Sequence, residues 1–568
     1  MHFVFPAFSF LDAKLMRTFT LLLVTLLANT ALHAQDRSHG RSMVITPNGI
    51  VATSHYLASQ AGAQILAKGG SPVDAAIASN AVLSVTEPMM NGIGGDLFAI
   101  YWDAKTGKLT GINASGWAPL GLTPGHLHAR DVSKMPQFGI DSVTVPGCVA
   151  GWAAMHKRFG RLPWRDLLQP AIYYAEHGYA VPEIIHDVWS NPHLTDEGKR
   201  VFLPTGRPPE VGELFRNPDY ARTLRLLAEG GPDAFYRGEI SKAILTTSTE
   251  LGGTMTADDL AQFQPEWVEP ISTEYRGWRV YELPPNGQGM AALSMLNMME
   301  QSQPAPDGPQ GTSEMHKKME AMKLAYADLA RYVADPKFAK VPTQGLISKQ
   351  YSAERAKLID PNKARCDYPP GTPPQSDTTY LSVVDRDGNI VSWIQSNYEH
   401  FGSGIVVRGM GFPLQDRGAL FVLEPGHPNL LVGRKRPFHT IIPAFMEKGD
   451  EHIGFGIMGG ANQPLAHAQF VSNFVDYGMN IQAALSAPRF TVSGDTCHLL
   501  IESRVKAEVI EQLRAKGQNL QVRKEYSELM GRGQAVLHNS AKKMNFAASD
   551  PRADGSAEAE VPDFNAPR

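Results

Sequence analysis

A proline-rich segment in the second half of the chain separates two regions with different sequence periodicity. Residues 369–374 contain four prolines. Because proline has a fixed φ and no backbone N–H, this segment suits neither a helix interior nor a central strand. We therefore expect residues 361–377 to form a loop or linker. Apolar residues recur mainly at helical spacing before this linker and at strand spacing after it.

The region before the linker is predicted to be rich in helices. Gly69 and Gly70 end the first helix, while Ser71 and Asp74 provide an N-cap and an acidic first turn for the next. The second helix is small and apolar nearly all round, which predicts burial. A strand is expected at residues 97–102. The predicted helices cover residues 56–68, 72–85, 149–158, 165–177, 219–229 and 313–334.

The region after the linker is predicted to form an antiparallel sheet with helices packed on it. Residues 379–385 and 390–396 are β-rich and are separated by a glycine-containing turn, a pattern typical of a hairpin. A second hairpin is expected from residues 441–445 and 452–457. Residues 556–568 are polar and are predicted to form a tail.

Length and composition exclude several classes of protein. With 568 residues, 43% hydrophobic and 19% charged, the chain can bury a large core and is neither a disordered tail nor a fibre. Its 53 Lys and Arg residues against 57 Asp and Glu residues leave a net charge of -4. Since there is no positive excess to attract a phosphate backbone, nucleic acid is not an expected partner.

The cysteines suggest a protein that is stabilised by its core. Cys148, Cys366 and Cys497 are too few and too scattered to predict a disulfide framework or a zinc cluster. Their odd number leaves at least one thiol unpaired. We therefore expect stability to come from packing and not from cross-links.

The N-terminus resembles a secretory signal. Met16 and Arg17 precede an apolar run over residues 18–32, and Ala34 is a suitable last residue before cleavage. Residues 1–34 are therefore predicted to be a signal peptide, with Met16 as an alternative start. Because the run is short for a bilayer span, a cleaved signal is favoured over an uncleaved membrane anchor. The mature protein is expected to be exported and to have no stable membrane span.

A glycine motif near the C-terminal hairpins allows three readings. Residues 454–459 fit G-x-G-x-x-G, and Asp476 lies at a distance suitable for a ribose contact in a dinucleotide site. Against this reading, the preceding strand comes from a hairpin and not from a βαβ unit. Alternatively, Gly459 and Gly460 form an oxyanion hole with their backbone N–H groups. A simple tight turn is the third reading.

The end of the linker contains a candidate nucleophile. Thr378 follows Asp377 where the proline-rich loop meets the first predicted hairpin. A threonine hydroxyl needs a nearby base, and its own α-amine can serve if the preceding peptide bond is cut. A threonine that merely begins a strand is also ordinary. The sequence has no G-x-S-x-G, H-E-x-x-H or P-loop motif that would indicate another mechanism.

These motifs together resemble the γ-glutamyltranspeptidase family of N-terminal-nucleophile hydrolases. The similarity runs in order over roughly residues 45–556. It implies an α+β fold, a four-layer αββα sandwich made as one precursor and divided into a large subunit, residues 35–377, and a small subunit, residues 378–568. The matching segments are residues 69–76, 92–96, 377–389, 401–406, 435–437, 458–460, 487–490 and 549–555.

The resemblance also implies catalytic roles for individual residues. Thr378 is expected to attack the Asp377 carbonyl, so that the resulting ester is hydrolysed and the small subunit begins at Thr378. The freed amine then acts as the base when the hydroxyl attacks a substrate amide. Gly459 and Gly460 match the oxyanion-hole pair, and Ser396 replaces a threonine whose hydroxyl contacts the nucleophile. The resemblance implies no metal and no organic cofactor.

Several positions depart from the transpeptidases proper. Ser115 stands where those enzymes have an arginine that binds the γ-glutamyl carboxylate, and Leu420 stands where they have an acid that binds the amine. Arg417 is a candidate to hold a carboxylate from another direction. The pattern is closer to the divergent branch with oxamate amidohydrolase and acylase-like members. The expected substrate-binding residues are Ser115, Tyr398, Arg417, His439 and Thr440.

The sequence supports three hypotheses about function. We favour an autoprocessed, exported amidase that acts on a small-molecule amide and passes the acyl group to water or to an amine. A second hypothesis is a glutathione hydrolase or γ-glutamyltransferase proper. A third is a binding protein that keeps the fold but has lost processing, which the intact Thr378 and its glycine pair argue against.

Overall fold

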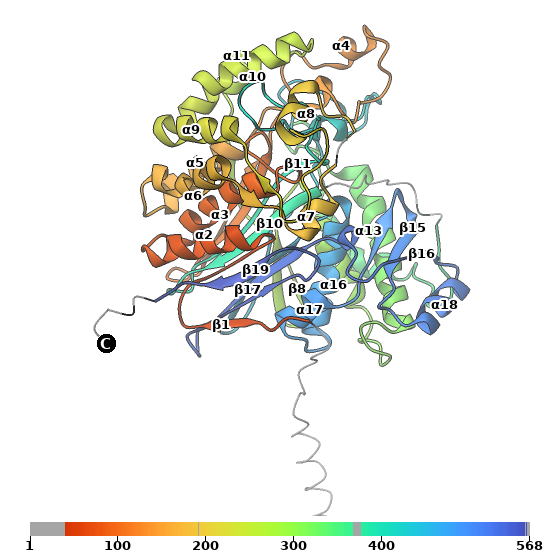
Figure 1. Cartoon of the computed structure of the whole chain (residues 1–568). Coiled ribbons are helices and arrows are strands. Elements are labelled where there is room, and N and C mark those ends of the chain that lie inside the picture. Colours follow the sequence, from red (N-terminus) through yellow and green to blue (C-terminus); the bar gives the residue numbers. More distant parts are fainter. Residues whose placement is uncertain (1–39, 191, 367, 369–376, 563, 565–568) are drawn as a thin grey trace, which may run out of the picture. The chain divides into compact units, whose positions relative to one another are not determined.

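The core of the protein consists of two β-sheets that lie face to face with helices on both outer sides (Figure 1). The computed structural model describes residues 40–190, 192–366, 368, 377–562 and 564. Within this part of the chain the layers run helix, sheet, sheet, helix, so the predicted α+β four-layer αββα sandwich is confirmed. The predicted signal peptide at residues 1–34 and the prolines at residues 369–374 lie outside the described residues.

The first sheet has the predicted hairpin at its centre. All its strands pair antiparallel, and Val384 lies opposite Ile390 at the hairpin turn. The sheet combines strands from before and after the linker, so the two regions fold as one unit. In spatial order the strands are β19 (Ser556–Ala559), β2 (Ile50–Thr53), β10 (Asp377–Val384), β11 (Ile390–Tyr398), β3 (Asp96–Asp103), β4 (Lys108–Ala114) and β7 (Glu266–Val268).

The second sheet is also antiparallel throughout. It contains the second predicted hairpin, but the first strand begins at Ala444 and not at Ile441, because Pro443 has no N–H for the ladder. In spatial order its strands are β1 (Val44–Thr46), β18 (Met544–Ser549), β17 (Gly533–Asn539), β13 (Glu451–Ile457), β12 (Ala444–Lys448), β9 (Trp278–Glu282) and β8 (Ile271–Tyr275).

Four helices on the first sheet match the predicted ranges within a residue at each end, whereas the predicted helix at 219–229 extends to Tyr236 and the helix at Glu239–Glu250 was not predicted. Every residue of α3 is buried, and a reciprocal capping box joins the Ser71 hydroxyl to the Asp74 N–H and the Asp74 carboxylate to the Ser71 N–H. This capping and the apolar surface explain why the helix forms and why it lies inside. The helices of this layer are α2 (Tyr56–Ala67), α3 (Pro72–Thr86), α5 (Cys148–Phe159), α6 (Trp164–His177), α9 (Pro218–Tyr236) and α10 (Glu239–Glu250).

The second sheet is covered by α12 (Gly289–Met299), α13 (Thr312–Tyr332), α16 (Gln463–Val475) and α17 (Ile481–Ser486). A small third sheet stands beside this layer (Figure 1), made of β14 (Phe490–Ser493), β15 (Asp495–Glu502) and β16 (Asn519–Arg523). The shorter elements are α4 (Pro124–His128), η1 (Ile140–Ser142), β5 (Tyr179–Ala180), α7 (Glu183–Asp187), α8 (Asp196–Phe202), β6 (Leu214–Phe215), α11 (Ala257–Ala261), α14 (Thr343–Leu346), α15 (Lys349–Ala356), η2 (Arg417–Leu420), η3 (Gly460–Asn462), α18 (Ala507–Ala515) and η4 (Glu528–Met530). Among the described residues, no helix combines the length and the apolar character needed to cross a membrane.

Two sequence predictions were wrong. The expected polar tail begins with a strand, because β19 pairs through its backbone with β2, and this pairing does not require apolar side chains. The cysteines do form a cross-link: Cys366 and Cys497 are joined by a disulfide with their Cα atoms 5.5 Å apart. Spacing along the chain gave no sign of this contact. Cys148 is free and buried, in agreement with the predicted unpaired thiol.

The glycine motif allows the two sheets to approach each other closely. A Cβ atom on Gly454 would lie 2.6 Å from the Ile390 side chain, and one on Gly456 would lie 2.4 Å from the Tyr380 ring. Both contacts connect β13 with the hairpin of the first sheet. The dinucleotide reading is therefore wrong: the motif lies in an antiparallel strand, and its first two glycines serve sheet packing.

We predict that Gly456→Ala destabilises the fold, because the added methyl group overlaps the Tyr380 ring between the two sheets. The expected loss is about 1–3 kcal/mol in the free energy of unfolding, measured by denaturant titration. Gly345→Ala is the matched control, since a Cβ atom there meets nothing within 4 Å. Equal stability of the two variants would contradict this packing role.

Candidate active site

The candidate nucleophile lies at an irregularity where the central hairpin of the first sheet ends. Asp377 pairs with Tyr398 and Thr379 pairs with Gln395, so Thr378 faces two residues of β11 at a β-bulge. The Thr378 side chain is fully buried, and its Oγ1 donates to the Ser396 Oγ at 3.3 Å. That same Ser396 oxygen accepts the Tyr398 N–H at 2.8 Å. The sequence prediction thus paired Thr378 and Ser396 correctly in space.

The glycine pair forms a strained turn directly after β13. Gly459 has a φ of 128° and Gly460 a φ of 56°, backbone conformations that other residues rarely adopt. The Gly459 carbonyl accepts the Asn462 N–H at 3.0 Å, and the Gly460 carbonyl accepts the Gln288 side-chain amide at 2.7 Å. Because both carbonyls are occupied by protein donors, the turn has a fixed orientation. Its N–H groups are the candidate oxyanion donors.

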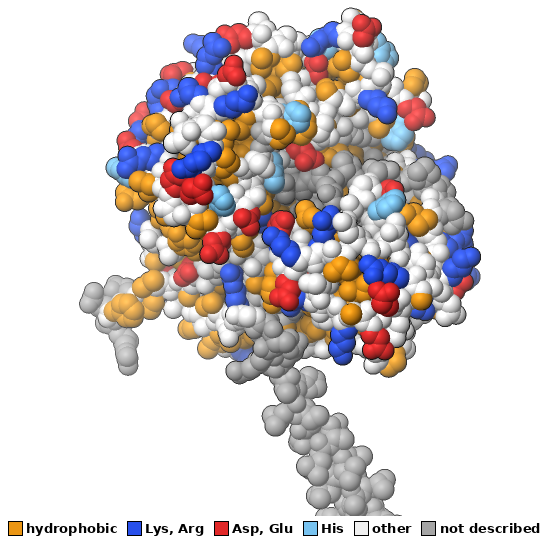
Figure 2. Space-filling model, turned by 45° about the vertical axis from the view of Figure 1, so that its right-hand side comes forward, with side chains coloured by type: hydrophobic (Ala, Val, Ile, Leu, Met, Phe, Trp, Pro, Cys, Tyr) orange, Lys and Arg blue, Asp and Glu red, His pale blue; other side chains and the backbone are white. Residues whose placement is uncertain are grey.

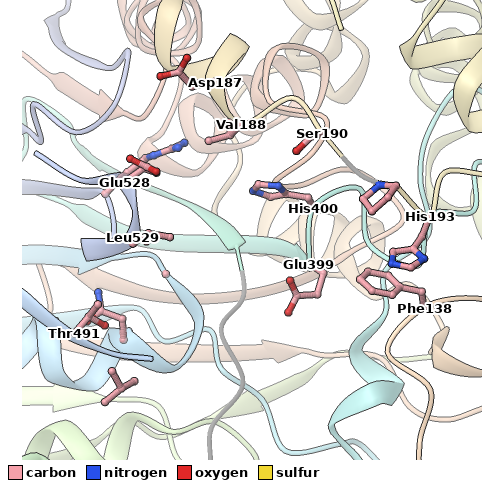
Figure 3. Close-up of a pocket in the computed structure, with 15 residues that line it drawn as sticks. Phe138, Asp187, Val188, Ser190, His193, Glu399, His400, Thr491, Glu528 and Leu529 are labelled. Atoms are coloured by element: carbon pink, nitrogen blue, oxygen red, sulfur yellow. The ribbon is translucent and has the colours of Figure 1, made fainter. Parts of the chain in front are cut away.

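A polar cavity of about 410 Å³ borders this turn, and Gly459 is part of its lining. The loop after β11 contributes Glu399 and His400 to one wall, while Glu528 and Thr491 lie on the opposite wall (Figure 3). Glu399 directly follows Tyr398, whose N–H bonds to the Ser396 hydroxyl, so this wall of the cavity continues from the strand end that faces Thr378. It is therefore the candidate cavity for a small substrate.

A buried arginine lies beside the bulge. Arg417 is fully buried, its Nη1 donates to the Thr440 Oγ1 at 2.5 Å, and its guanidinium lies 4.6 Å from the centre of the Tyr398 ring. Burial lowers the pKa of Arg417 to about 10, against the opposing charge of Asp96, so it remains cationic at neutral pH. Its Nε and Nη2 have no hydrogen-bond partner among the described residues. Such a group suits a ligand carboxylate.

Two other predicted binding residues are engaged with the protein itself. The Ser115 hydroxyl donates to the Asn113 side chain at 2.7 Å and accepts from the Asn286 amide at 3.2 Å. His439 contacts Asp96 through Nε2 at 2.9 Å and accepts the Ile441 N–H at Nδ1. Burial lowers the pKa of His439 to about 4, so the imidazole is neutral. These contacts favour structural roles for both side chains.

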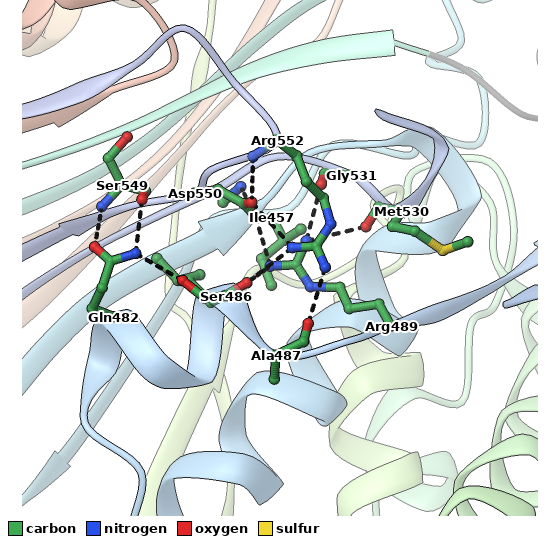
Figure 4. A network of polar contacts seen from close by, with 12 residues as sticks. Ile457, Gln482, Ser486, Ala487, Arg489, Met530, Gly531, Ser549, Asp550 and Arg552 are labelled. Atoms are coloured by element: carbon green, nitrogen blue, oxygen red, sulfur yellow. Dashed lines mark hydrogen bonds and ion pairs between the residues drawn. The ribbon is translucent and has the colours of Figure 1, made fainter. Parts of the chain in front are cut away.

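A network of buried charges supports the glycine turn from behind, and the sequence prediction did not assign it. Arg489 donates to the carbonyls of Met530 and Gly531 at 3.2 and 2.9 Å and to Asp550 at 2.6 Å (Figure 4). The Cα atom of Gly531 lies 3.2 Å from the position of a Cβ atom on Gly459, which shows how closely the two turns pack.

The charges within this network are balanced. Arg552 bonds to both Asp550 and Glu502. Burial alone would raise the pKa of Asp550, but the charges of Arg489 and Arg552 outweigh it and hold the pKa below its ordinary value. Both arginines lie in motifs that signalled the family, residues 487–490 and 549–555, and motif membership was the only available signal of their importance.

No group of three His, Cys, Asp or Glu side chains in the described part of the chain is arranged to hold a metal.

A buried threonine at the start of a central strand, a rigid diglycine turn and an αββα sandwich together define an N-terminal-nucleophile hydrolase. The chain belongs to the gamma-glutamyltranspeptidase family, whose model matches residues 58–560. It is therefore an autoprocessed amidase or acyltransferase of this family, made as a proenzyme that yields two subunits.

Individual relatives place the chain within the family. It is 37% identical to the glutathione hydrolase-like YwrD proenzyme of Bacillus subtilis over 90% of this chain and 99% of that protein. It is 32% identical to the oxamate amidohydrolase proenzyme of Klebsiella pneumoniae, over 90% of this chain and 98% of that protein. A solved structure, cephalosporin acylase from Bacillus halodurans, matches with a TM-score of 0.86 and 40% identity, covering 93% of this chain and 99% of that one.

We predict that Arg489→Lys impairs catalysis, because Arg489 bonds the two turn carbonyls through Nη1 and Asp550 through Nη2, and the single nitrogen of lysine cannot hold both sides at once. The expected effect is a roughly 10- to 100-fold lower kcat for amide hydrolysis, with a smaller change in KM. Arg355→Lys is the matched control, since Arg355 also donates to a backbone carbonyl, that of Leu324, and pairs with an aspartate, Asp328, but has no contact with this network. A folded Arg489→Lys enzyme with wild-type kcat would refute the supporting role.

Proposed function

We propose that the chain is cut between Asp377 and Thr378, which gives a large subunit of residues 35–377 and a small subunit of residues 378–568. The observation that carries this proposal is the buried Thr378 hydroxyl bonded to Ser396 at the bulge of β10. Attack of the Thr378 oxygen on the Asp377 carbonyl carbon moves the acyl group from nitrogen to oxygen. This shift frees the Thr378 α-amine. Water then hydrolyses the ester, which releases the new α-carboxylate of Asp377 and restores the Thr378 hydroxyl.

The same residues account for turnover of a substrate amide. The Thr378 amine accepts the hydroxyl proton while the oxygen attacks the substrate carbonyl, and the N–H groups of Gly459 and Gly460 stabilise the resulting oxyanion. Collapse of the tetrahedral intermediate releases the substrate amine, which takes the proton, and leaves an acyl-enzyme. Attack by water completes hydrolysis, whereas attack by an acceptor amine completes transfer. Ser396 orients the nucleophile through its contact with Thr378.

Arg417 indicates the class of acyl donor. Because its Nε and Nη2 have no partner in the part of the chain that the structure describes, they favour an acyl donor that carries a carboxylate close to the reacting carbonyl. Oxamate, the substrate in the name of one relative, has this form. Tyr398 supports the guanidinium with its ring, and Thr440 binds its other edge. In this arrangement Thr440 and Tyr398 position Arg417.

Glutathione is the second candidate substrate, because one relative is named a glutathione hydrolase-like proenzyme. Two features argue against efficient use of a γ-glutamyl donor. Ser115 is neutral and already bonded to two asparagines. Leu420 offers no charge for an ammonium group and lines an apolar cavity of about 540 Å³ together with Phe421 and Phe438. Release of glutamate from glutathione measures this alternative directly.

Export is the proposed location, and residues 1–34 act as the signal in this account. The disulfide between Cys366 and Cys497 supports an oxidising compartment, since such bonds are rare in reducing cytosol. A processing-dead binding protein is disfavoured, because the threonine, its serine partner and the rigid glycine turn are all in place.

We predict that Thr378→Ala abolishes both processing and activity, because it removes the attacking oxygen. On a reducing denaturing gel the wild type should give chains of about 37 and 21 kDa by residue share. The alanine variant should stay as one chain. Thr378→Ser keeps a hydroxyl and should still be cut. Normal cutting of the alanine variant would exclude Thr378 as the nucleophile.

We predict that Arg417→Met raises the KM for oxamate roughly 10- to 100-fold, because the substrate carboxylate loses its charged partner. Oxamide, which has the same skeleton without the carboxylate, is the matched control substrate. Its KM should change little. KM is measured for both amides by ammonia release. An equal rise in KM for oxamate and oxamide would contradict carboxylate binding by Arg417.

A further inference from the structure

The disulfide joins the two sides of the proposed cut. Cys366 follows α15 and precedes Thr378 in the chain, whereas Cys497 lies in β15 of the small third sheet. Cleavage between Asp377 and Thr378 would therefore leave one cysteine in each subunit. We propose that this disulfide is a covalent bond between the large and small subunits of the mature enzyme, an inference that rests on the proposed cleavage.

The chain around Cys366 is docked on the future small subunit. The Ala364 N–H donates to the Lys516 carbonyl at 2.7 Å, and the Lys516 ammonium group donates to the Pro361 carbonyl at 2.7 Å. These bonds fix the segment against the turn between α18 and β16. The cysteines are thus brought together by several contacts that do not depend on the disulfide itself.

The same segment is also held by the large subunit. The Arg365 N–H donates to the Glu320 carboxylate at 3.2 Å, and His316 contacts the Asp360 carbonyl at 2.8 Å, both from α13. Residues 360–366 therefore lie in a seam between α13 on one side and α18 with β16 on the other. A cross-link at this seam ties the end of the large subunit to the small one.

The accessibility of the sulfurs suits oxidation of the folded precursor. Cys366 is exposed and Cys497 is half-buried, whereas Cys148 is buried and its thiol contacts the Gln395 side chain. Two thiols and an external disulfide, such as oxidised glutathione, give the protein disulfide and two reduced thiols. This exchange transfers two electrons and two protons to the external disulfide. Cys148 takes no part.

The cross-link limits how far the new carboxyl terminus can move. Asp377 is eleven residues beyond Cys366, so after the cut it stays within about 40 Å of that cysteine even when fully extended. Without the bond only non-covalent contacts would hold this segment. The two chains should therefore stay together under denaturing conditions until a reductant is added.

The experiment compares one preparation of the wild-type enzyme, made in an oxidising compartment and alkylated before denaturation, on reducing and non-reducing gels. We expect chains of about 37 and 21 kDa with reductant and one species of about 58 kDa without it. Cys497→Ser should give two chains on both gels. Cys148→Ser is the matched control and should behave like the wild type.

Other gel patterns would overturn the inference in distinguishable ways. Two wild-type chains on both gels would contradict the cross-link but leave the cleavage intact, whereas one chain on both gels would contradict the cleavage and the inference together. Mass spectrometry provides a second readout if Cys497→Ser fails to fold. The denatured wild type should take up alkylating reagent at one cysteine before reduction and at three after it, and three before reduction would refute the disulfide.

Discussion

The pairing of β10 between β2 and β11 is the interaction on which the site depends. The β2 and β3 strands come from before the proposed cut, and β10 and β11 come after it, yet all four lie side by side in one sheet. Breaking the peptide bond before Thr378 therefore leaves the pairing of β10 from Thr379 onward intact and separates only its first residue, Asp377, which lies opposite Tyr398. The new amine would form on a strand that is already held in place, next to a hydroxyl already bonded to Ser396.

Buried charges are paired in one part of the site and left partly unpaired in another. Behind the glycine turn, Arg489 and Arg552 are paired with Asp550 and Glu502, so the support is rigid and electrostatically balanced. Near the candidate nucleophile, by contrast, Arg417 has two donor groups with no partner in the described part of the chain. A buried guanidinium left in this state costs free energy in the free enzyme, and a bound carboxylate would recover it.

Local patterns explain which parts of this structure could be predicted from the sequence. Both hairpins and the helices α2, α3, α5, α6, α9 and α13 follow from periodicity and capping, which act over a few residues, whereas α10, α12, α16 and α17 were not predicted. The β19 strand was missed because backbone pairing with β2 is a long-range contact, and the Cys366–Cys497 bond was missed for the same reason. The family resemblance indicated Thr378, Ser396 and the glycine pair as candidate catalytic residues. The unpaired edge of Arg417 and the engagement of Ser115 depend on packing that only coordinates reveal.

The most direct test of this account is the intact mass and N-terminal residue of the small chain, isolated from the wild-type enzyme under reducing conditions. The proposed cleavage predicts a chain that begins at Thr378 with a free α-amine and has the mass of residues 378–568. A small chain that begins at any other residue, or a preparation in which the precursor remains whole, would contradict the proposal that Thr378 is released as the N-terminal nucleophile.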